Sequence, residues 1–180
     1  MQNDKSIYNI FAMAIFFIAM IGWMGISERL FSLSDDVETY QDQLEISLKK
    51  KEQLISEVGT DSVFFDNNGD TISLRLVKAL NGLKSAIKSD DIRLMYSANY
   101  ELDSSLTFMK TTAVIKPEVK ESEHYIELIN ELQQNEEMLK SRVELYNNSV
   151  SIYNDAIQLF PSNIVAYMLR LNQKNYFAAT

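Results

Sequence analysis

The sequence predicts an all-α protein, with an N-terminal transmembrane helix followed by an antiparallel up-and-down four-helix bundle that has a long final helix. Three observations lead to this fold class. Residues 10–26 form an uncharged apolar run, apolar residues then recur every three or four positions, and loop signals separate the repeating segments. A spacing of three and four places side chains on one face of a helix, and four such helices joined by short connections make a bundle.

The apolar run near the N-terminus predicts a membrane anchor. Residues 10–26 with their flanks reach the ~20 residues that a helix needs to cross the hydrocarbon core. Tyr8 and Trp23 lie near its two ends, where aromatic rings prefer the headgroup level. A cleavable secretion signal is the alternative, but the run lacks a small-x-small cleavage site, and only Lys5 is basic before it. We therefore expect residues 1–27 to form a tail and a retained anchor.

Few charged residues indicate on which side of the membrane the bundle lies. We expect membrane contact through residues 7–27, with Lys5 and the terminal amine on one side and Arg29 on the other. The excess of basic residues that usually fixes orientation is therefore almost absent. The short N-terminal tail favours placing the bundle outside the cytoplasm.

The first bundle helix has two possible starts. No glycine or proline occurs between Gly25 and Gly59, so the membrane helix can run directly into it. Alternatively, Ser32 or Ser34 caps a new helix, because acids follow in its first turn. In either case the repeat is Leu30, Leu33, Val37, Tyr40, Leu44, Ser47, Lys51, Leu54 and Val58.

Two shorter helices follow a loop. Residues 59–70 carry the turn signal Asn68-Gly69. Apolar repeats then predict helices over 72–87 and 95–113, and residues 89–91 shift the phase between them and supply caps. A proline at position 117 excludes continuation of the second of these helices.

The final long helix carries the most sustained repeat in the chain. We expect it to start within 118–122 and to stop at Phe160-Pro161. We expect a short helix over 164–172, packed through Met168, Leu169 and Leu171 on the bundle end or the membrane. The stripe of the long helix is Ile129, Leu132, Glu136, Leu139, Val143, Tyr146, Val150, Tyr153, Ile157 and Phe160.

Composition excludes several classes of function. With 25 acidic and 17 basic residues the net charge is -8, which argues against a nucleic-acid surface. The absence of cysteine removes disulfides and thiolate metal sites. Glu121 and His124 have a di-metal spacing, but the chain has a single histidine, and residues 66–70 do not fit a calcium loop. No Gly-x-Ser-x-Gly elbow for a serine nucleophile is present. Together these observations lead us to expect no metal, no cofactor and no enzyme activity.

A polar face on the final helix is the candidate site. Two Tyr-Asn pairs lie one heptad apart on this helix. One interpretation places the tyrosines in the core, with Glu136 as the acceptor for a tyrosine hydroxyl. The other is a polar groove that binds a peptide or partner helix. The residues of this face are Glu136, Tyr146, Asn147, Tyr153, Asn154 and Asn163.

Several motifs in the second half of the chain resemble the LemA family. They are Lys116-Pro117-Glu118-Val119-Lys120, Leu128, Glu131-Leu132, Glu136, Tyr146-Asn147, Tyr153-Asn154, Phe160-Pro161-Ser162-Asn163, Val165-Ala166 and Tyr176-Phe177. The resemblance implies a small bacterial protein with one membrane helix and an antiparallel helical bundle, and it implies no established activity, catalytic residue or cofactor. We expect the LemA-like bundle over residues 28–172 and a C-terminal tail over 173–180.

Two hypotheses about function follow. The first is a single-pass protein of the bacterial inner membrane that acts as a non-catalytic scaffold, binding an envelope protein or a second copy of itself. It predicts an exposed apolar strip. The alternative is a ligand-binding or enzymatic bundle with a polar site around Glu136, Tyr146 and Tyr153, which predicts a cavity lined by these residues.

Overall fold

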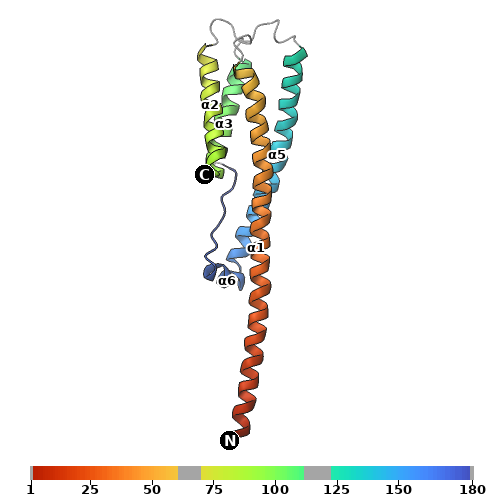
Figure 1. Ribbon diagram of the computed structural model, residues 1–180, viewed down its shortest axis with the longest axis vertical. Coiled ribbons are helices and arrows are strands. Elements are labelled where there is room, and N and C mark those ends of the chain that lie inside the picture. The colour runs from red at the N-terminus through yellow and green to blue at the C-terminus, as the bar shows by residue number, and fades with distance from the viewer. Residues whose placement is uncertain (1, 61–69, 112–122, 179–180) are drawn as a thin grey trace. The chain divides into compact units, whose positions relative to one another are not determined.

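The computed structural model describes residues 2–60, 70–111 and 123–178. Within these ranges the chain is all-α, with five helices and no strand (Figure 1). The predicted turn at residues 66–69, the break at Pro117 and the predicted start of the last long helix lie outside the described residues. The helices are α1 (Gln2–Thr60), α2 (Asp70–Ser89), α3 (Ile92–Thr111), α5 (Glu123–Gln158) and α6 (Ser162–Met168).

Helix α1 continues from the apolar run into the amphipathic segment without a break. The first of the two predicted starts is therefore the one observed, and no cap forms at Ser32 or Ser34. The apolar side chains of residues 10–21 are exposed, for example Ile18 at 71%. By its length and composition this part of α1 could cross a membrane, and none of its most apolar window is buried within the protein.

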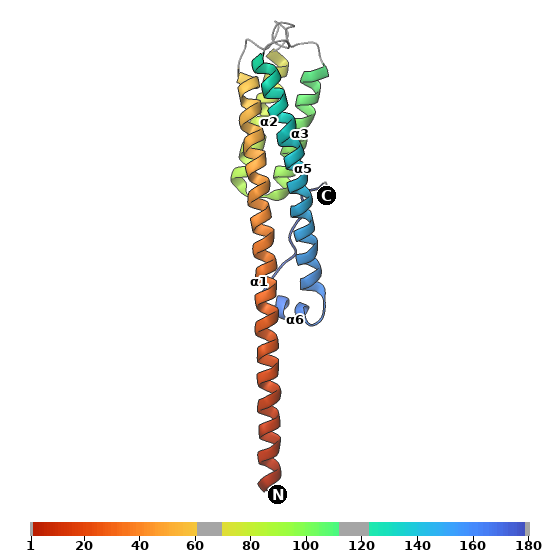
Figure 2. The ribbon, with the colours of Figure 1, turned by 90° about the vertical axis from the view of Figure 1, so that its right-hand side faces the viewer.

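The chain divides into two compact units, Met1–Glu38 with Ser149–Lys174, and Thr39–Asn148 with Asn175–Thr180. In the first unit α6 lies beside α1, as both views show (Figures 1 and 2). Seven buried apolar side chains from α1, α5 and α6 make its core. They are Leu30, Val37, Val150, Tyr153, Ile157, Val165 and Ala166.

In the second unit α2 and α3 pack against each other. Asp90 takes a left-handed conformation with φ of 55°, which aspartate tolerates better than most residues. Asp91 then caps α3, because its Oδ1 accepts hydrogen bonds from the N–H groups of Arg93 (2.9 Å) and Leu94 (3.4 Å). Hydrogen bonds from Arg93 hold the pKa of Asp91 below its ordinary value. The predicted boundary at residues 89–91 is confirmed.

The predicted stripe of α5 is buried for most of its length. Leu132, Leu139, Tyr146, Val150, Tyr153 and Ile157 are all less than 9% exposed. Phe160 was wrongly placed on this stripe and is 80% exposed, because α5 ends at Gln158 and the helical spacing no longer applies beyond that residue.

The short helix after the proline is confirmed as α6, but Met168 does not pack on the bundle end, which was one of its two predicted surfaces. Val165 and Ala166 are buried, whereas Met168 is 64% exposed. The helix ends at Met168, and Arg170 reverses the chain with φ of 55°. Helix α6 therefore packs on the protein through two residues in its middle, Val165 and Ala166.

Tyr153 provides a test of the core. Replacing it with alanine removes a ring that is 1% exposed and should lower the free energy of unfolding by about 3 to 5 kcal/mol. Tyr100→Ala is the matched control, because Tyr100 is 67% exposed and its loss should change stability by about 0.5 kcal/mol or less. Denaturant unfolding of the full-length protein in detergent, followed by circular dichroism, measures both. Equal stability of the two variants would contradict the core assignment.

Candidate functional site

A lysine side chain is buried in the interior of the second unit. Lys51 of α1 occupies a position in the apolar repeat, and its side chain is 0% exposed. Its Nζ lies 2.5 Å from Oδ1 of Asp103 on α3 and 2.6 Å from Oε1 of Glu136 on α5. It also donates a hydrogen bond to Oδ1 of Asn99 at 2.9 Å. The ammonium therefore donates hydrogen bonds to Asn99 and Asp103 and forms an ion pair with Glu136.

The partners of Lys51 are themselves held in place. Asn99 donates from Nδ2 to the second carboxylate oxygen of Asp103 at 3.1 Å. The side chains of Asp103 and Glu136 are 41% and 40% exposed, so both carboxylates keep part of their hydration while they neutralise the buried cation. The arrangement supplies countercharge without placing two further full charges in the core.

A second group of polar contacts joins α5 to α1 nearby. Arg142 donates from Nη1 to the carbonyl oxygen of Gln43 (2.6 Å) and to the hydroxyl of Ser47 (2.8 Å). Asn135 donates to the carbonyl oxygen of Ser47 at 3.1 Å. These contacts and those of Lys51 form a layer that we call the polar layer, made of Gln43, Ser47, Lys51, Asn99, Asp103, Asn135, Glu136 and Arg142.

Sequence reasoning placed Lys51 and Glu136 on the helix stripes but did not pair them. Glu136 was expected to accept from a tyrosine hydroxyl. This was wrong for Tyr146, whose hydroxyl donates to the carbonyl oxygen of Asn175 at 2.7 Å. The signal that could have revealed the pair was a lysine in the apolar repeat of one helix and a glutamate in the apolar repeat of another.

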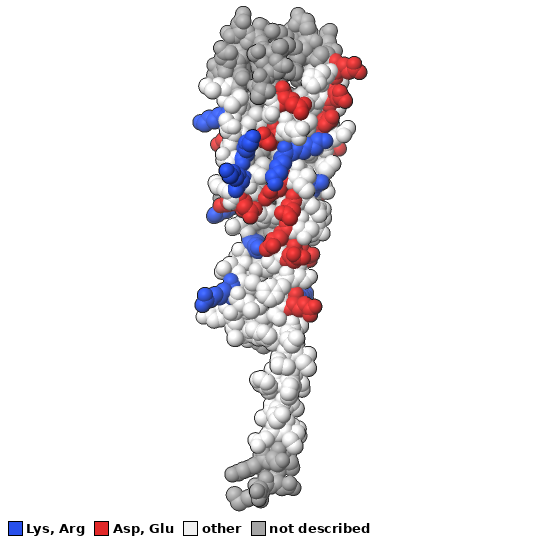
Figure 3. Space-filling view, in the orientation of Figure 1, with Lys and Arg blue, Asp and Glu red and all other residues white. Residues whose placement is uncertain are grey.

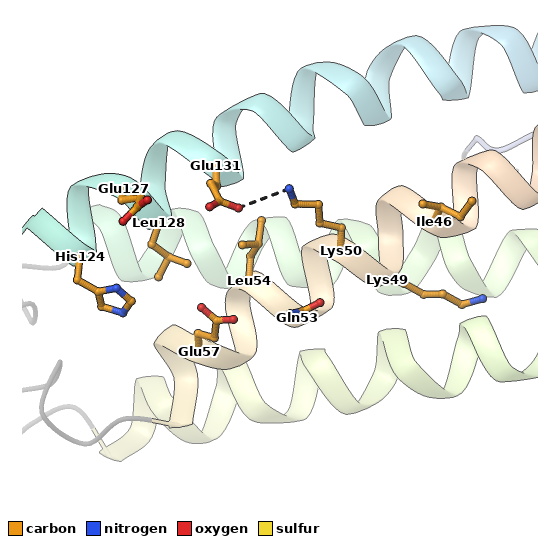
Figure 4. Close-up of a pocket in the computed structure, with 10 residues that line it drawn as sticks. All are labelled: Ile46, Lys49, Lys50, Gln53, Leu54, Glu57, His124, Glu127, Leu128 and Glu131. Carbon is orange, nitrogen blue, oxygen red and sulfur yellow. Dashed lines mark ion pairs between the residues drawn. The ribbon is translucent and has the colours of Figure 1, made fainter.

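A groove of about 690 Å³ lies between the C-terminal part of α1 and the start of α5 (Figure 4). Lys50 and Glu131 pair across it at 3.4 Å. Acidic and basic side chains are interspersed on the face shown in Figure 3. Among the described residues no group of three or more His, Asp or Glu side chains is placed to hold a metal ion. The groove is lined by Ile46, Lys49, Lys50, Gln53, Leu54, Glu57, His124, Glu127, Leu128 and Glu131.

Both tyrosines of the predicted polar face lie in the core, at 1% exposure each. Burial, with a smaller contribution from the negative charge of Asp90, raises the pKa of Tyr146 to about 12. Burial and the charge of Glu38 also raise the pKa of Tyr153. The neutral phenols are therefore the stable forms, and the rings fill space that a ligand cavity would need.

The two asparagines next to these tyrosines hold the backbone of the C-terminal segment. In the first unit Asn154 donates from Nδ2 to the carbonyl oxygen of Lys174 (3.0 Å) and accepts from the N–H of Lys174 (2.9 Å). In the second unit Asn147 makes the same pair of bonds with Phe177, at 3.3 and 2.8 Å. We call each pair of bonds an asparagine clamp. Each satisfies both polar groups of one residue that has no secondary structure of its own.

The segment expected to be a tail is therefore tied to α5. Phe177 is 5% exposed and its ring packs edge-on against Tyr96, with centroids 5.4 Å apart. Lys174 also pairs with Glu38 at 3.4 Å. Asn163 takes no part in the clamps, since its side chain is exposed and its N–H donates to the carbonyl oxygen of Leu159 at 2.8 Å.

The polar layer predicts an unusual order of stabilities. The double variant Asp103→Asn/Glu136→Gln leaves a buried ammonium without countercharge and should lower the free energy of unfolding by about 3 to 5 kcal/mol. Adding Lys51→Met should recover much of this loss, because the charge that needed compensation is gone. Lys49→Met removes a pair between the exposed ammonium of Lys49 (58%) and Glu45 (14%) within one helix, and it should cost about 0.5 kcal/mol or less. Denaturant unfolding measures all four proteins. A triple variant no more stable than the double would contradict the layer.

The clamps predict local release of the C-terminal segment. Asn147→Ala removes both bonds to Phe177 and should lower stability by about 1 to 3 kcal/mol. The N–H of Phe177 should then exchange with solvent much faster, as hydrogen exchange would measure. Asn163→Ala is the control and should leave that exchange rate unchanged. Protection of Phe177 that survives Asn147→Ala would show that the clamp does not hold the segment.

The polar layer and both asparagine clamps lie within the part of the chain that matches a known family. The sequence model of the LemA family matches residues 40–180. A comparison with curated proteins found no match. Because the family match covers more than half of the chain, this protein belongs to the LemA family.

Proposed function

We propose that this protein is a single-pass membrane-anchored scaffold of the bacterial cell envelope, with no catalytic activity of its own. The apolar segment of α1 anchors it in the inner membrane, and the helical domain lies outside the cytoplasm. Its partner is an envelope protein or a second copy of the chain.

The exposed apolar segment of α1 supports the membrane anchor. Large side chains such as Phe16 and Ile21 are each 66% exposed and lie outside the buried cores of the described residues. Water is a poor environment for so many adjacent apolar residues, whereas the ~30 Å hydrocarbon core accommodates a helix of this length.

The second unit is proposed to be an antiparallel up-and-down four-helix bundle of α2, α3 and the parts of α1 and α5 within it. Contacts from Lys51 to α3 and α5, and from Arg142 to α1, support this arrangement, since they require the three helices to lie close together. The packing of α2 on α3 supplies the fourth helix.

The neutralisation of Lys51 is the observation that carries the non-catalytic interpretation. General acid–base and nucleophilic catalysis need ionisable groups that face a substrate. Here the carboxylates of Asp103 and Glu136 are occupied by Lys51, and the rings of Tyr146 and Tyr153 fill the core. The alternative of a ligand or active site around Glu136 and these tyrosines therefore has less support.

A strip of exposed apolar side chains on α5 is the proposed partner surface. Met138 and Leu145, both in the second unit, are seven residues apart and are 49% and 43% exposed. Residues seven apart lie on one helix face, and because each of these two immediately precedes a buried stripe residue, the strip lies about 100° around the helix from the stripe. Such a strip suits a partner helix better than a small polar ligand.

Membrane fractionation with photocrosslinking tests the proposal. The full-length protein should stay with membranes after a carbonate wash, because its apolar segment anchors it integrally. A photoreactive amino acid at Leu145 should give a discrete crosslinked product, either with one envelope protein or with a second copy. The same group at the exposed neighbour Glu144 should not. Release by carbonate would refute the anchor, and identical crosslinking at both positions would refute the strip.

A further inference from the structure

A cluster of exposed apolar side chains surrounds α6 in the first unit. Phe160, Ile164, Tyr167 and Met168 are 80%, 51%, 85% and 64% exposed, and Leu159 before them is 64% exposed. The other face of α6 is packed, with Val165 and Ala166 buried. Exposed apolar side chains gathered within ten residues mark a surface that something else covers.

The position of α6 along α1 indicates what covers this cluster. From residue 9 onward, Leu30 is the first buried residue of α1, four residues beyond the end of the apolar run at Ile26. If that run fills the hydrocarbon core, a headgroup layer of roughly 6 Å takes the next four or five residues at 1.5 Å each. Leu30 then lies at headgroup level, and the rest of the unit, in which α6 lies beside α1, begins at that level (Figure 2).

The chemistry of the cluster fits that level. Aromatic rings with a polar tip, such as that of Tyr167, prefer the boundary between lipid and water. Phe31 on α1 is 54% exposed at the same level. Arg29 and Arg170 are exposed, and their long side chains can reach lipid phosphates.

We propose that α6 and the turn before it form a second membrane contact, in which Phe160, Ile164, Tyr167 and Met168 insert at the lipid headgroup level beside α1. This inference rests on the proposed membrane anchor and adds a site to it. A second copy of the chain is a weaker candidate, because a stable dimer buries about 800 Å² on each partner, more than one seven-residue helix offers.

Tryptophan fluorescence in vesicles tests this contact, because Trp23 is the single tryptophan of the chain. The full-length protein is reconstituted into phosphatidylcholine vesicles that carry bromine either near the headgroup or near the chain end. Trp23 of the natural protein reports on the anchor. The variant Trp23→Phe/Tyr167→Trp reports on α6. The control Trp23→Phe/Asp36→Trp carries its probe on α1 about 15 Å beyond Ile26, in water.

The expected result is a strong loss of emission from the probe at position 167 with shallow bromine, a smaller loss with deep bromine, and no loss at position 36. A probe at 167 that behaves like the one at 36, in vesicles where Trp23 is quenched, would overturn the second contact and leave the anchor standing. Unquenched Trp23 would overturn both. A blue-shifted emission at 167 that is insensitive to bromine and disappears on dilution into excess lipid would show that a second copy covers α6, which also overturns the contact.

Discussion

The buried ammonium of Lys51 constrains the second unit more than any apolar contact does. Removing such a group from water costs several kcal/mol, and this cost is offset only when countercharges reach it with good geometry. Asp103 and Glu136 come from different helices, so both helices must hold one register against α1. Apolar packing tolerates sliding and substitution, whereas an unpaired buried charge does not. The polar layer therefore specifies the arrangement.

The repeated Tyr-Asn pairs follow from the same helix register. Asn147 and Asn154 are seven residues apart, a rise of about 10.5 Å along α5. The residues they hold, Lys174 and Phe177, are three apart along the C-terminal segment. In each Tyr-Asn pair the tyrosine ring is buried, and the amide that follows it binds the backbone of one residue of this segment.

Apolar periodicity was sufficient to predict the helices and their stripes, because burial of one face leaves a local pattern in the sequence. It could not predict which polar groups meet. Lys51 and Asp103 are 52 positions apart, and Asn147 and Phe177 are 30 apart, so their pairing depends on tertiary structure. The error at Phe160 has another cause. It extrapolated helical spacing past Gln158, where α5 ends and side-chain direction is set by the turn.

Under the proposed membrane anchor, helix α1 serves two environments. From residue 10 to 26 its apolar residues are on every face, as expected of a helix surrounded by lipid. From Leu30 onward the buried residues keep to one stripe, as expected of a helix packed on one side. Because α1 has no break between its apolar part and its amphipathic part, the faces of the apolar part have a fixed rotation relative to the buried stripe that begins at Leu30. Under the proposed function, a partner helix that binds the apolar part of α1 would then meet a face fixed by Leu30 and Val37. The continuity of α1 would give the proposed scaffold a defined orientation around its anchor, which a flexible linker would not.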